Sequence, residues 1–510
     1  MKNIFLILGT FLIVGSVQSQ NITDAYRYSS EELNGTARFR AMSGAFGALG
    51  GDLSAITINP ASSAVFLNSF GTMTLDHSDS NKQVNYFGTT TSNENSDLNF
   101  NQAGGVLVFD TRSNSPWKKF SLGLNYQKTN NFDDAFVASG TSQTSIDQYF
   151  LNYANGVPLD LLQTREDDPL TPENEAETIS DLYSYLGENQ GFGAQQAFLG
   201  YQGFIIDQAD DSPENTSYNS FIGSGNFNQE YRSVSTGLNG KFSFNVGTQY
   251  KDFLYLGANL NTHFLSYDRT TRFRENNNNA GSATNEVVFN NNLSTVGDGF
   301  SFQLGAIAKV SDRFRVGASY HSPTWFNITE EATQYLETNN NANERVVVNP
   351  NVLNVYPDYN LKTPGKLTGS LAVLFGTKGL ISFDYSYKDF SATEFRPNND
   401  PEFEFQNELI SNELQAVSTF RLGGEYRINN WSLRGGYRYE QSPYANESTV
   451  GDLTGYSGGI GYDFGSMKLD LAYTNASFQE NPRLYETGLT NTANIDRDLS
   501  NIILSLSFGL

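Results

Sequence analysis

Four arginines at alternating positions on two neighbouring segments are the side chains best suited to hold an acidic group. Arg421 and Arg427 precede an Asn429-Asn430 turn, and Arg434 and Arg438 follow it. Guanidinium groups bind carboxylates through paired, charge-assisted hydrogen bonds. Other segments add two further basic positions of the same kind. The candidate lumenal contacts are Arg315, Arg421, Arg427, Arg434, Arg438 and Lys468.

Carboxylates fall among these basic residues, at Asp384, Glu425, Asp463 and Asp470. A low-dielectric interior favours the pairing of such opposite charges. One interpretation is a structural network that also grips the N-terminal part of the chain. In the other, one arginine holds the carboxylate of a ligand. The sequence leaves both open.

The residues that usually catalyse reactions show no useful spacing. His77, His263 and His321 lie on separate segments without the spacing of metal ligands. His321 and Ser322 are neighbours in a strand pattern, so their side chains point to opposite faces and cannot form a dyad. A phosphate-cradling glycine loop followed by lysine is absent from the sequence. We therefore predict a protein that is not an enzyme and needs no metal or cofactor.

Apolar residues at helical spacing recur in a long polar connection at about 131–228. One interpretation is that these faces pack on each other and cover one end of the fold, and the other is that they form a landing surface for an apolar ligand. The residues of this candidate capture surface are Tyr149, Phe150, Tyr153, Leu182, Tyr183 and Leu186.

The elements that position the arginines are β-strands. Between residues 420 and 439, apolar Phe420, Leu422 and Tyr426 alternate with charged residues on both sides of the Asn429-Asn430 turn. Side chains in a strand alternate between two faces, so this hairpin has one apolar face and one charged face. Strands near ten residues, aromatic residues at their ends and turns that are short on one side only favour a membrane barrel over a soluble sandwich.

Fourteen such strands can be placed between residue 68 and the C-terminus, an even number that permits closure with both termini in the periplasm. We predict an all-β, antiparallel transmembrane barrel over residues 68–510. The longer connections, at about 131–228, 330–362, 394–415 and 478–499, then face outward. The short periplasmic turns are predicted at Ser113 to Pro116, Gln249 to Asp252, Ser311 to Arg313, Gly376 to Gly379, Asn429-Asn430 and Gly465-Ser466.

Composition agrees with an exported strand protein. Residues 1–19 carry Lys2, an apolar run from Ile4 to Val14 and a cleavage-like end, so we predict a signal peptide. The chain has no Cys, hence no disulfides, and 14% aromatic residues with 46 Gly favour strands and tight turns. Loss of Lys2 with the signal takes the formal charge from -23 to -24, which argues against a nucleic-acid partner.

Residues 20–67 lack strand alternation and are rich in glycine. Small residues let backbone pack closely, and the Asn-Pro dipeptide favours a local turn. We predict a compact plug, or hatch, in the lumen, because a fourteen-strand barrel would otherwise leave an open channel. The residues of the hatch motif are Gly44, Gly47, Gly50, Gly51, Asn59, Pro60 and Ala61.

The stretch from Gly35 to Asp52, followed by Asn59-Pro60-Ala61, resembles the N-terminal hatch of the FadL/OmpP1/TodX outer-membrane transporters, especially those of Bacteroidota. Similar segments recur at Arg315 to Pro323, Thr363-Pro364 and Trp431 to Pro443. The resemblance implies a monomer in the outer membrane that takes up hydrophobic molecules such as long-chain fatty acids. It also implies gating by the hatch and lateral release into membrane lipid near the third strand.

Two departures from the family pattern concern the outer connections and the hatch. The connection after the fifth strand, Glu275 to Glu286, is short, and the bulk lies after the third strand instead. Ser62-Ser63 follows the Asn-Pro-Ala motif where many relatives have Gly-Leu. Two other functions stay open, an accessory barrel that docks in a protein-export machine and a passive porin for polar solutes.

Overall fold

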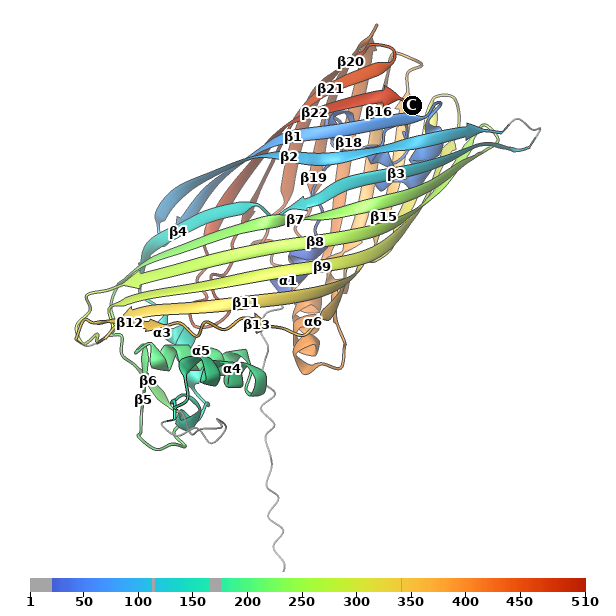
Figure 1. Ribbon diagram of the computed structural model, residues 1–510. Helices are drawn as coiled ribbons and strands as arrows, with labels where there is room; N and C mark the ends of the chain where they lie inside the picture. The colour runs from blue at the N-terminus through green and yellow to red at the C-terminus, as the bar shows by residue number, and fades with distance from the viewer. Residues whose placement is uncertain (1–20, 112–114, 166–175, 341) are drawn as a thin grey trace, which may run out of the picture.

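The computed structural model describes residues 21–111, 115–165, 176–340 and 342–510, which form one closed antiparallel barrel (Figure 1). The signal sequence predicted for residues 1–19 lies outside the described residues. Each wall strand pairs with the next along the chain, and β1 closes the barrel on β22 with Phe70 opposite Gly509. The fourteen wall strands are β1 (Phe70–Tyr86), β2 (Thr89–Asp110), β3 (Trp117–Asn131), β7 (Phe227–Tyr250), β8 (Leu254–Asn276), β9 (Glu286–Lys309), β10 (Phe314–His321), β15 (Lys366–Leu374), β16 (Gly379–Asp389), β18 (Ala416–Ile428), β19 (Trp431–Glu440), β20 (Leu453–Asp463), β21 (Met467–Glu480) and β22 (Asn494–Gly509). The prediction of a fourteen-strand barrel is confirmed.

Shorter strands extend the wall on the side of the long connections. β11 (Trp325–Asn339) continues β10 beyond a break at Pro323, and both strands pair with β9. β4 (Asp134–Ser142) continues β3 and forms a ladder with β7, so the connection predicted from residue 131 begins later than expected. The remaining extensions are β12 (Arg345–Val348), β13 (Asn354–Val355), β14 (Tyr359–Lys362) and β17 (Glu394–Arg396).

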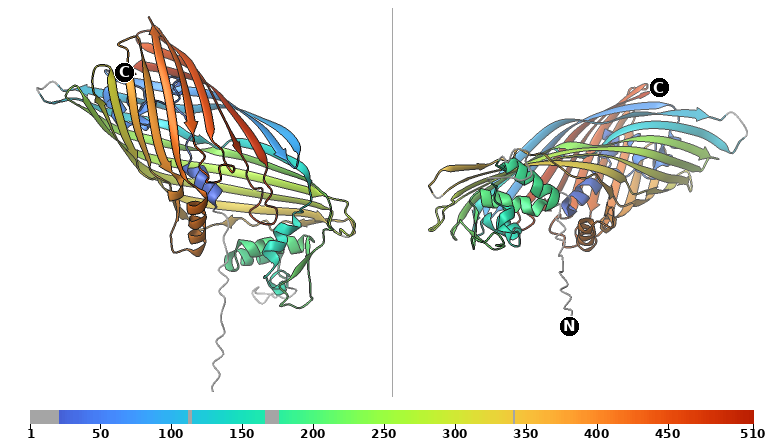
Figure 2. Two further views of the ribbon diagram at one scale, coloured as in Figure 1. Left: turned by 180° about the vertical axis from the view of Figure 1, so that it is seen from behind. Right: turned by 60° about the horizontal axis from the view of Figure 1, so that its bottom comes forward.

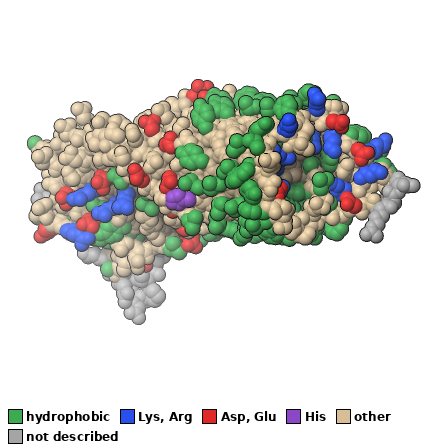
Figure 3. All heavy atoms as spheres, turned by 90° about the horizontal axis from the view of Figure 1, so that it is seen from above, with side chains coloured by type: hydrophobic (Ala, Val, Ile, Leu, Met, Phe, Trp, Pro, Cys, Tyr) green, Lys and Arg blue, Asp and Glu red, His purple; other side chains and the backbone are tan. Residues whose placement is uncertain are grey.

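Apolar side chains form a band across the face of the barrel that Figure 3 shows. On β7 the large exposed apolar residues are Phe242, Phe244 and Val246, all in the half near the short turn to β8. A membrane needs only about 9–11 residues of a tilted strand, whereas β7 has 24. The other half of the longest strands therefore stands beyond the apolar band.

The short turns gather at the end of the barrel that holds the C-terminus, as predicted, with residues 112–114 of one turn outside the described residues. At the opposite end a tight turn at Phe87-Gly88 joins β1 to β2. β2 begins at Thr89, earlier than the strand that apolar alternation indicates near Asn99 to Phe109. The segment after Gly88 is rich in Thr, Ser and Asn, so it lacks the apolar alternation by which strands were recognised.

Helices cover the end with the long connections (Figure 2). This outer subdomain contains α3 (Asp147–Ala154), α4 (Ile179–Asn189) and α5 (Phe192–Gln202), with η3 (Leu159–Leu161) and a small sheet of β5 (Ile206–Gln208) and β6 (Tyr218–Ser220). Nearby lie α6 (Pro401–Glu413) and η4 (Phe390–Ala392). None of the described helices is long and apolar enough to cross a membrane.

The N-terminal segment, residues 21–67, lies inside the barrel. It contains α1 (Ile22–Ser29), α2 (Ala37–Arg40), η1 (Ser54–Thr57) and η2 (Pro60–Val65). Asn21 bonds Glu486 in a long connection, and Tyr26 contacts Tyr444 there. The first described residues therefore lie near the outer connections, whereas the C-terminus lies at the short turns.

Several wall glycines lie against the part of this segment from Ala41 to Ala64. A Cβ at Gly257 would lie 2.4 Å from the Pro60 carbonyl carbon, and one at Gly317 would lie 2.2 Å from the Gly47 carbonyl oxygen. Strands on both sides of the lumen contribute to this glycine belt, so the N-terminal segment is held where side chains would exclude it. The glycine belt consists of Gly247, Gly257, Gly305, Gly317, Gly423, Gly436 and Gly459.

Replacing Gly257 by Ala should unseat the N-terminal segment, because the new Cβ meets Pro60 backbone that cannot rotate away. We expect a loss of about 1–3 kcal/mol, typical of overpacking. Thermal unfolding in detergent measures it. Gly369→Ala is the matched control, since a Cβ there meets no atom of the described chain within 4 Å. Equal stability of the two variants would contradict a seated segment.

Candidate functional site

The hatch-motif residues form the tightest contacts between the N-terminal segment and the wall. The Asn59 amide donates to the carbonyl oxygens of Gly47 (2.7 Å) and Ala306 (3.0 Å), and its oxygen accepts from the Ala61 amide. Pro60 opens η2. Gly44, Gly50 and Gly51 have positive φ, so these turns favour glycine.

Asp384 holds the turn at Gly47 from the wall. Its Oδ2 accepts from the backbone amides of Phe46 and Gly47, both at 2.9 Å. Wall side chains bond carbonyls of the same segment, for example Asn259 to Ile56 (3.0 Å) and Ser319 to Ile58 (2.7 Å). The backbone of the N-terminal segment is therefore satisfied by the barrel instead of by water.

Three guanidinium groups converge on the buried carboxylate of Glu425. Arg38 of the N-terminal segment approaches it at 2.9 Å, Arg434 at 2.7 Å and Arg427 at 2.6 Å. Arg434 also pairs with Asp470 at 2.6 Å. These ion pairs link the N-terminal segment to β18, β19 and β21. This is the geometry expected if the lumenal arginines form a structural network that grips the segment.

The other basic candidates are dispersed. Arg315 donates to the Leu49 carbonyl at 2.9 Å, and Lys468 pairs with Asp463 near the short turns. Arg421 donates to Ser386 at 3.3 Å, but its buried Nε has no hydrogen-bond partner among the described residues. Arg438, also buried, lines two cavities of the lumen, with volumes of about 280 and 40 Å³.

A cavity of about 960 Å³, the outer cavity, lies between the long connections and α1. Aromatic side chains from the wall, the helices and the connections line it. Its charged lining carries both signs, with Arg27, Arg269, Arg483 and Arg497 beside Asp134, Glu413, Glu480 and Glu486. Binding pockets for small molecules commonly have volumes of about 300–1,000 Å³ and largely apolar walls. The aromatic lining comprises Tyr26, Phe132, Phe136, Tyr149, Tyr153, Phe192, Tyr231, Tyr267, Tyr356, Tyr444 and Tyr485.

The predicted capture residues are mostly buried instead of exposed at the outer surface. Phe150, Leu182, Tyr183 and Leu186 pack with Tyr149 in one core that joins the helices to the wall, and Tyr153 is partly buried. Only Tyr149 and Tyr153 of the six line the outer cavity. The other aromatic lining residues are scattered through distant segments, so helical spacing alone could not identify them.

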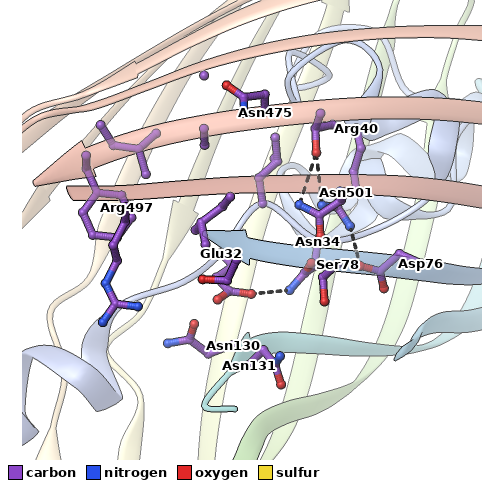
Figure 4. A pocket seen from close by; sticks show the side chains of 18 of the residues that line it. Glu32, Asn34, Arg40, Asp76, Ser78, Asn130, Asn131, Asn475, Arg497 and Asn501 are labelled. Carbon is purple, nitrogen blue, oxygen red and sulfur yellow. Dashed lines mark hydrogen bonds and ion pairs between the residues drawn. The ribbon is translucent and has the colours of Figure 1, made fainter. Parts of the chain in front are cut away.

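A smaller chamber of about 280 Å³, the inner chamber, adjoins the outer cavity, and many of its lining residues are polar or charged (Figure 4). Asn34 and Arg40 enter it from the N-terminal segment, and Asp76 enters it from β1. Both cavities share Tyr26, Asp134 and Arg497 in their linings. Arg497 binds Asp134 through two hydrogen bonds of 2.8 and 2.9 Å, so this ion pair stands at the boundary between them.

The wall beside the inner chamber has a gap between β2 and β3. The two strands pair only where residues 102–110 face residues 119–127, and the part of β2 from Thr89 to Asn101 has no ladder partner on this side among the described strands. Asn99 on β2 and Asn130 on β3 line the inner chamber at this gap. Register shifts at Asn101 on β2 and Thr129 on β3 mark the end of the gap that is nearer the short turns. Such β-bulges are found where pairing ends.

The three histidines lie on separate strands, but His263 and His321 line the same small space of about 30 Å³ in the lumen. His321 lies against the Ile58 carbonyl at 3.0 Å, His263 bonds Ser301 at 2.8 Å, and His77 lies on the outer face. No group of three or more potential metal ligands occurs within the part of the chain that the structure describes.

Comparison with known proteins gives the family. A family model described as "Outer membrane protein transport protein (OMPP1/FadL/TodX)" matches residues 219–508, more than half of the chain. The chain belongs to this family. The expected resemblance is thus confirmed, and the protein is an outer-membrane transport protein. No curated protein sequence matches it.

Solved structures of the family share the fold. A Pseudomonas aeruginosa FadL homologue is 12% identical, with a TM-score of 0.55 over 94% of this chain and 99% of that chain. The Pseudomonas putida toluene transporter TodX is 14% identical, with a TM-score of 0.50 over 94% of this chain and 100% of that chain. At these low sequence identities the comparison shows that the proteins share a fold.

Glu425→Gln should destabilise the protein by about 3–5 kcal/mol, because it leaves buried guanidinium charge without its carboxylate. Chemical unfolding in detergent measures the loss. The matched control is Glu337→Gln, whose partner Arg345 is 64% exposed, and we expect at most about 1 kcal/mol there. Similar losses for both variants would show that the Glu425 cluster does not hold the segment.

Proposed function

We propose that this transporter takes up hydrophobic small molecules such as long-chain fatty acids and releases them sideways into the membrane. The observation that carries the proposal is the outer cavity, which offers aromatic walls and arginines at the end of the long connections. An apolar chain gains about 25 cal/mol for each Å² that it removes from water. A carboxylate at the other end of the molecule is accommodated by arginine.

The N-terminal segment supports a hatch function. It fills the lumen between the outer cavity and the short turns. Its contacts with the glycine belt and Asp384 leave little freedom to the residues that follow residue 35. A straight path along the barrel axis would require these contacts to break together. Exit through the wall requires less rearrangement.

The gap between β2 and β3 supports lateral release. The inner chamber reaches this gap, and the adjoining strands carry exposed Phe100, Leu122 and Leu124 on their outer faces. A hydrophobic molecule that leaves here meets lipid before it meets water, which avoids exposing its chain to the aqueous periplasm. On the side of the gap nearer the long connections, β4 contacts the hairpin of β1 and β2. The Thr91 hydroxyl donates to the Val137 carbonyl, and the Lys82 ammonium donates to the Ala135 carbonyl.

A docking role in protein export is the second candidate. The size of the outer subdomain, with α3, α4 and α5, supports it. Copurification with exported cargo would favour docking. A passive porin is the weaker alternative, because the N-terminal segment occupies the lumen.

A crosslink between β2 and β4 tests lateral release. The chain has no native Cys, so the double variant Thr91→Cys, Val137→Cys forms only the intended disulfide. We expect oxidation to abolish most uptake of radiolabelled dodecanoate by cells that lack their own fatty-acid transporter, because the hairpin can no longer part from β4. Reductant should restore uptake.

The matched control for this crosslink is Asn85→Cys, Thr90→Cys, which joins β1 to β2 within the same hairpin and leaves β4 free. Oxidation of this pair should leave uptake unchanged. Full uptake by the oxidised Thr91–Val137 variant would refute an exit that requires this part of the wall to open.

A further inference from the structure

Four charged side chains meet where β4 approaches the hairpin of β1 and β2. Lys82 lies on β1, Asp134 begins β4, Glu480 ends β21 and Arg497 lies on β22. Asp134 pairs with both Lys82 and Arg497, and Arg497 also pairs with Glu480. We call these four residues the seam cluster. Sequence analysis did not single them out, because they come from four segments that are far apart in the chain.

The seam cluster is largely enclosed by protein. The side chain of Lys82 is 0% exposed, and that of Arg497 is 13% exposed. The two carboxylates are partly buried and face these two cations. Charges of opposite sign therefore balance within the cluster. Separating such enclosed pairs leaves charges without partners, which is strongly unfavourable.

The seam cluster holds the wall at a place where side chains make the contacts. β4 forms its ladder with β7 on one side. On the other side, toward the hairpin, the Lys82 ammonium donates to the Ala135 carbonyl at 2.9 Å, and the Thr91 hydroxyl donates to the Val137 carbonyl. The ion pairs with Asp134 therefore add to a few hydrogen bonds in fixing the start of β4 against the hairpin.

The seam cluster also bounds the gap between β2 and β3 on the side of the long connections. The ladder between β2 and β3 ends where Gln102 faces Gln127. Lys82 lies opposite Asn93 in the ladder of the hairpin, so its pair with Asp134 crosses to β4 at that level. The open stretch of β2 lies between these two levels. The height of the gap thus depends on how closely the cluster holds β4.

The same side chains stand between the two cavities. Asp134 and Arg497 line both the outer cavity and the inner chamber, and Glu480 lines the outer cavity. On the proposed route of release, a molecule passes these residues before it reaches the gap. Charges that are already paired with each other offer little attraction to an apolar chain and are costly to separate. Their effect on such a molecule is therefore a restriction of width.

We propose that the seam cluster limits the width of the hydrophobic molecules that leave through the gap, with Asp134 as the positioning residue that holds β4 against the hairpin. The inference rests on the proposed uptake function and adds to it a basis for ligand selection. A straight alkyl chain passes while the cluster is intact. A molecule that carries a fused-ring group requires β4 to part from the hairpin.

Two spin labels report the position of β4 without any ligand. The chain has no native Cys, so the labels are attached at Ser96→Cys on β2 and Ser139→Cys on β4. Pulsed electron–electron double resonance of the full-length mature protein in detergent gives the distribution of distances between them. Asp134→Asn should extend this distribution to longer distances, because β4 loses its charged contacts with Lys82 and Arg497.

Asp133→Asn is the matched control for Asp134→Asn. It makes the same change of charge at the neighbouring residue and keeps a side-chain oxygen, which in Asp133 accepts from the Gly237 amide at 3.1 Å. The distance distribution of this variant should equal that of the wild-type protein.

Two ligands of different width test the selection itself. Uptake of dodecanoate and of pyrene-labelled dodecanoate is measured in cells that lack their own fatty-acid transporter. Asp134→Asn should raise uptake of the pyrene-labelled ligand about tenfold and leave uptake of dodecanoate within about twofold, because only the wider molecule is restricted by the cluster. Asp133→Asn should alter neither rate.

An unchanged distance distribution in Asp134→Asn, or an equal change in the uptake of both ligands, would overturn the inference while uptake stands. If the wild-type protein takes up neither ligand, the proposed uptake function fails and the limit on width fails with it. Should Asp134→Asn not fold, Lys82→Gln replaces it, since this variant leaves Asp134 paired with Arg497. A distance distribution that Lys82→Gln leaves unchanged would then overturn the inference.

Discussion

The fit between the glycine belt and the N-terminal segment is the constraint on which the rest of the structure depends. A fourteen-strand barrel encloses space that side chains of its own wall cannot fill. Here the space is filled by irregular backbone, whose polar groups need partners inside the lumen. Asp384, Asn259 and Ser319 supply hydrogen bonds, and the wall glycines allow the close approach that these bonds require.

This constraint applies to residues 35–66, which are enclosed by wall strands and tied to Glu425 through Arg38. α1 and residues 29–34 lie closer to the outer connections. They are held by the buried side chains of Ala25 and Tyr28, by hydrogen bonds such as that from Gln127 to the Asn34 carbonyl, and by the ion pair of Glu31 with Lys366. Because residues 35–66 fill the axis of the barrel, the proposed route of release is the gap between β2 and β3.

Much of the fold could be predicted from the sequence because a membrane barrel imposes simple alternation. Phe420, Leu422 and Tyr426 identify their strand, and the Asn429-Asn430 turn fixes its partner. The rule failed for the start of β2, where Thr and Asn face water beyond the membrane and no apolar face is needed. It also failed for the candidate site. Glu31 and Lys366 lie 335 positions apart, and their meeting depends on the path of the segment through the lumen.

Hydrogen–deuterium exchange of the detergent-solubilised protein, with and without dodecanoate, tests the central claim most directly. The account predicts that amides of residues 35–66 exchange slowly in both states. Exchange of residues 35–66 at the rate of the exposed connections, in either state, would contradict a segment seated in the barrel.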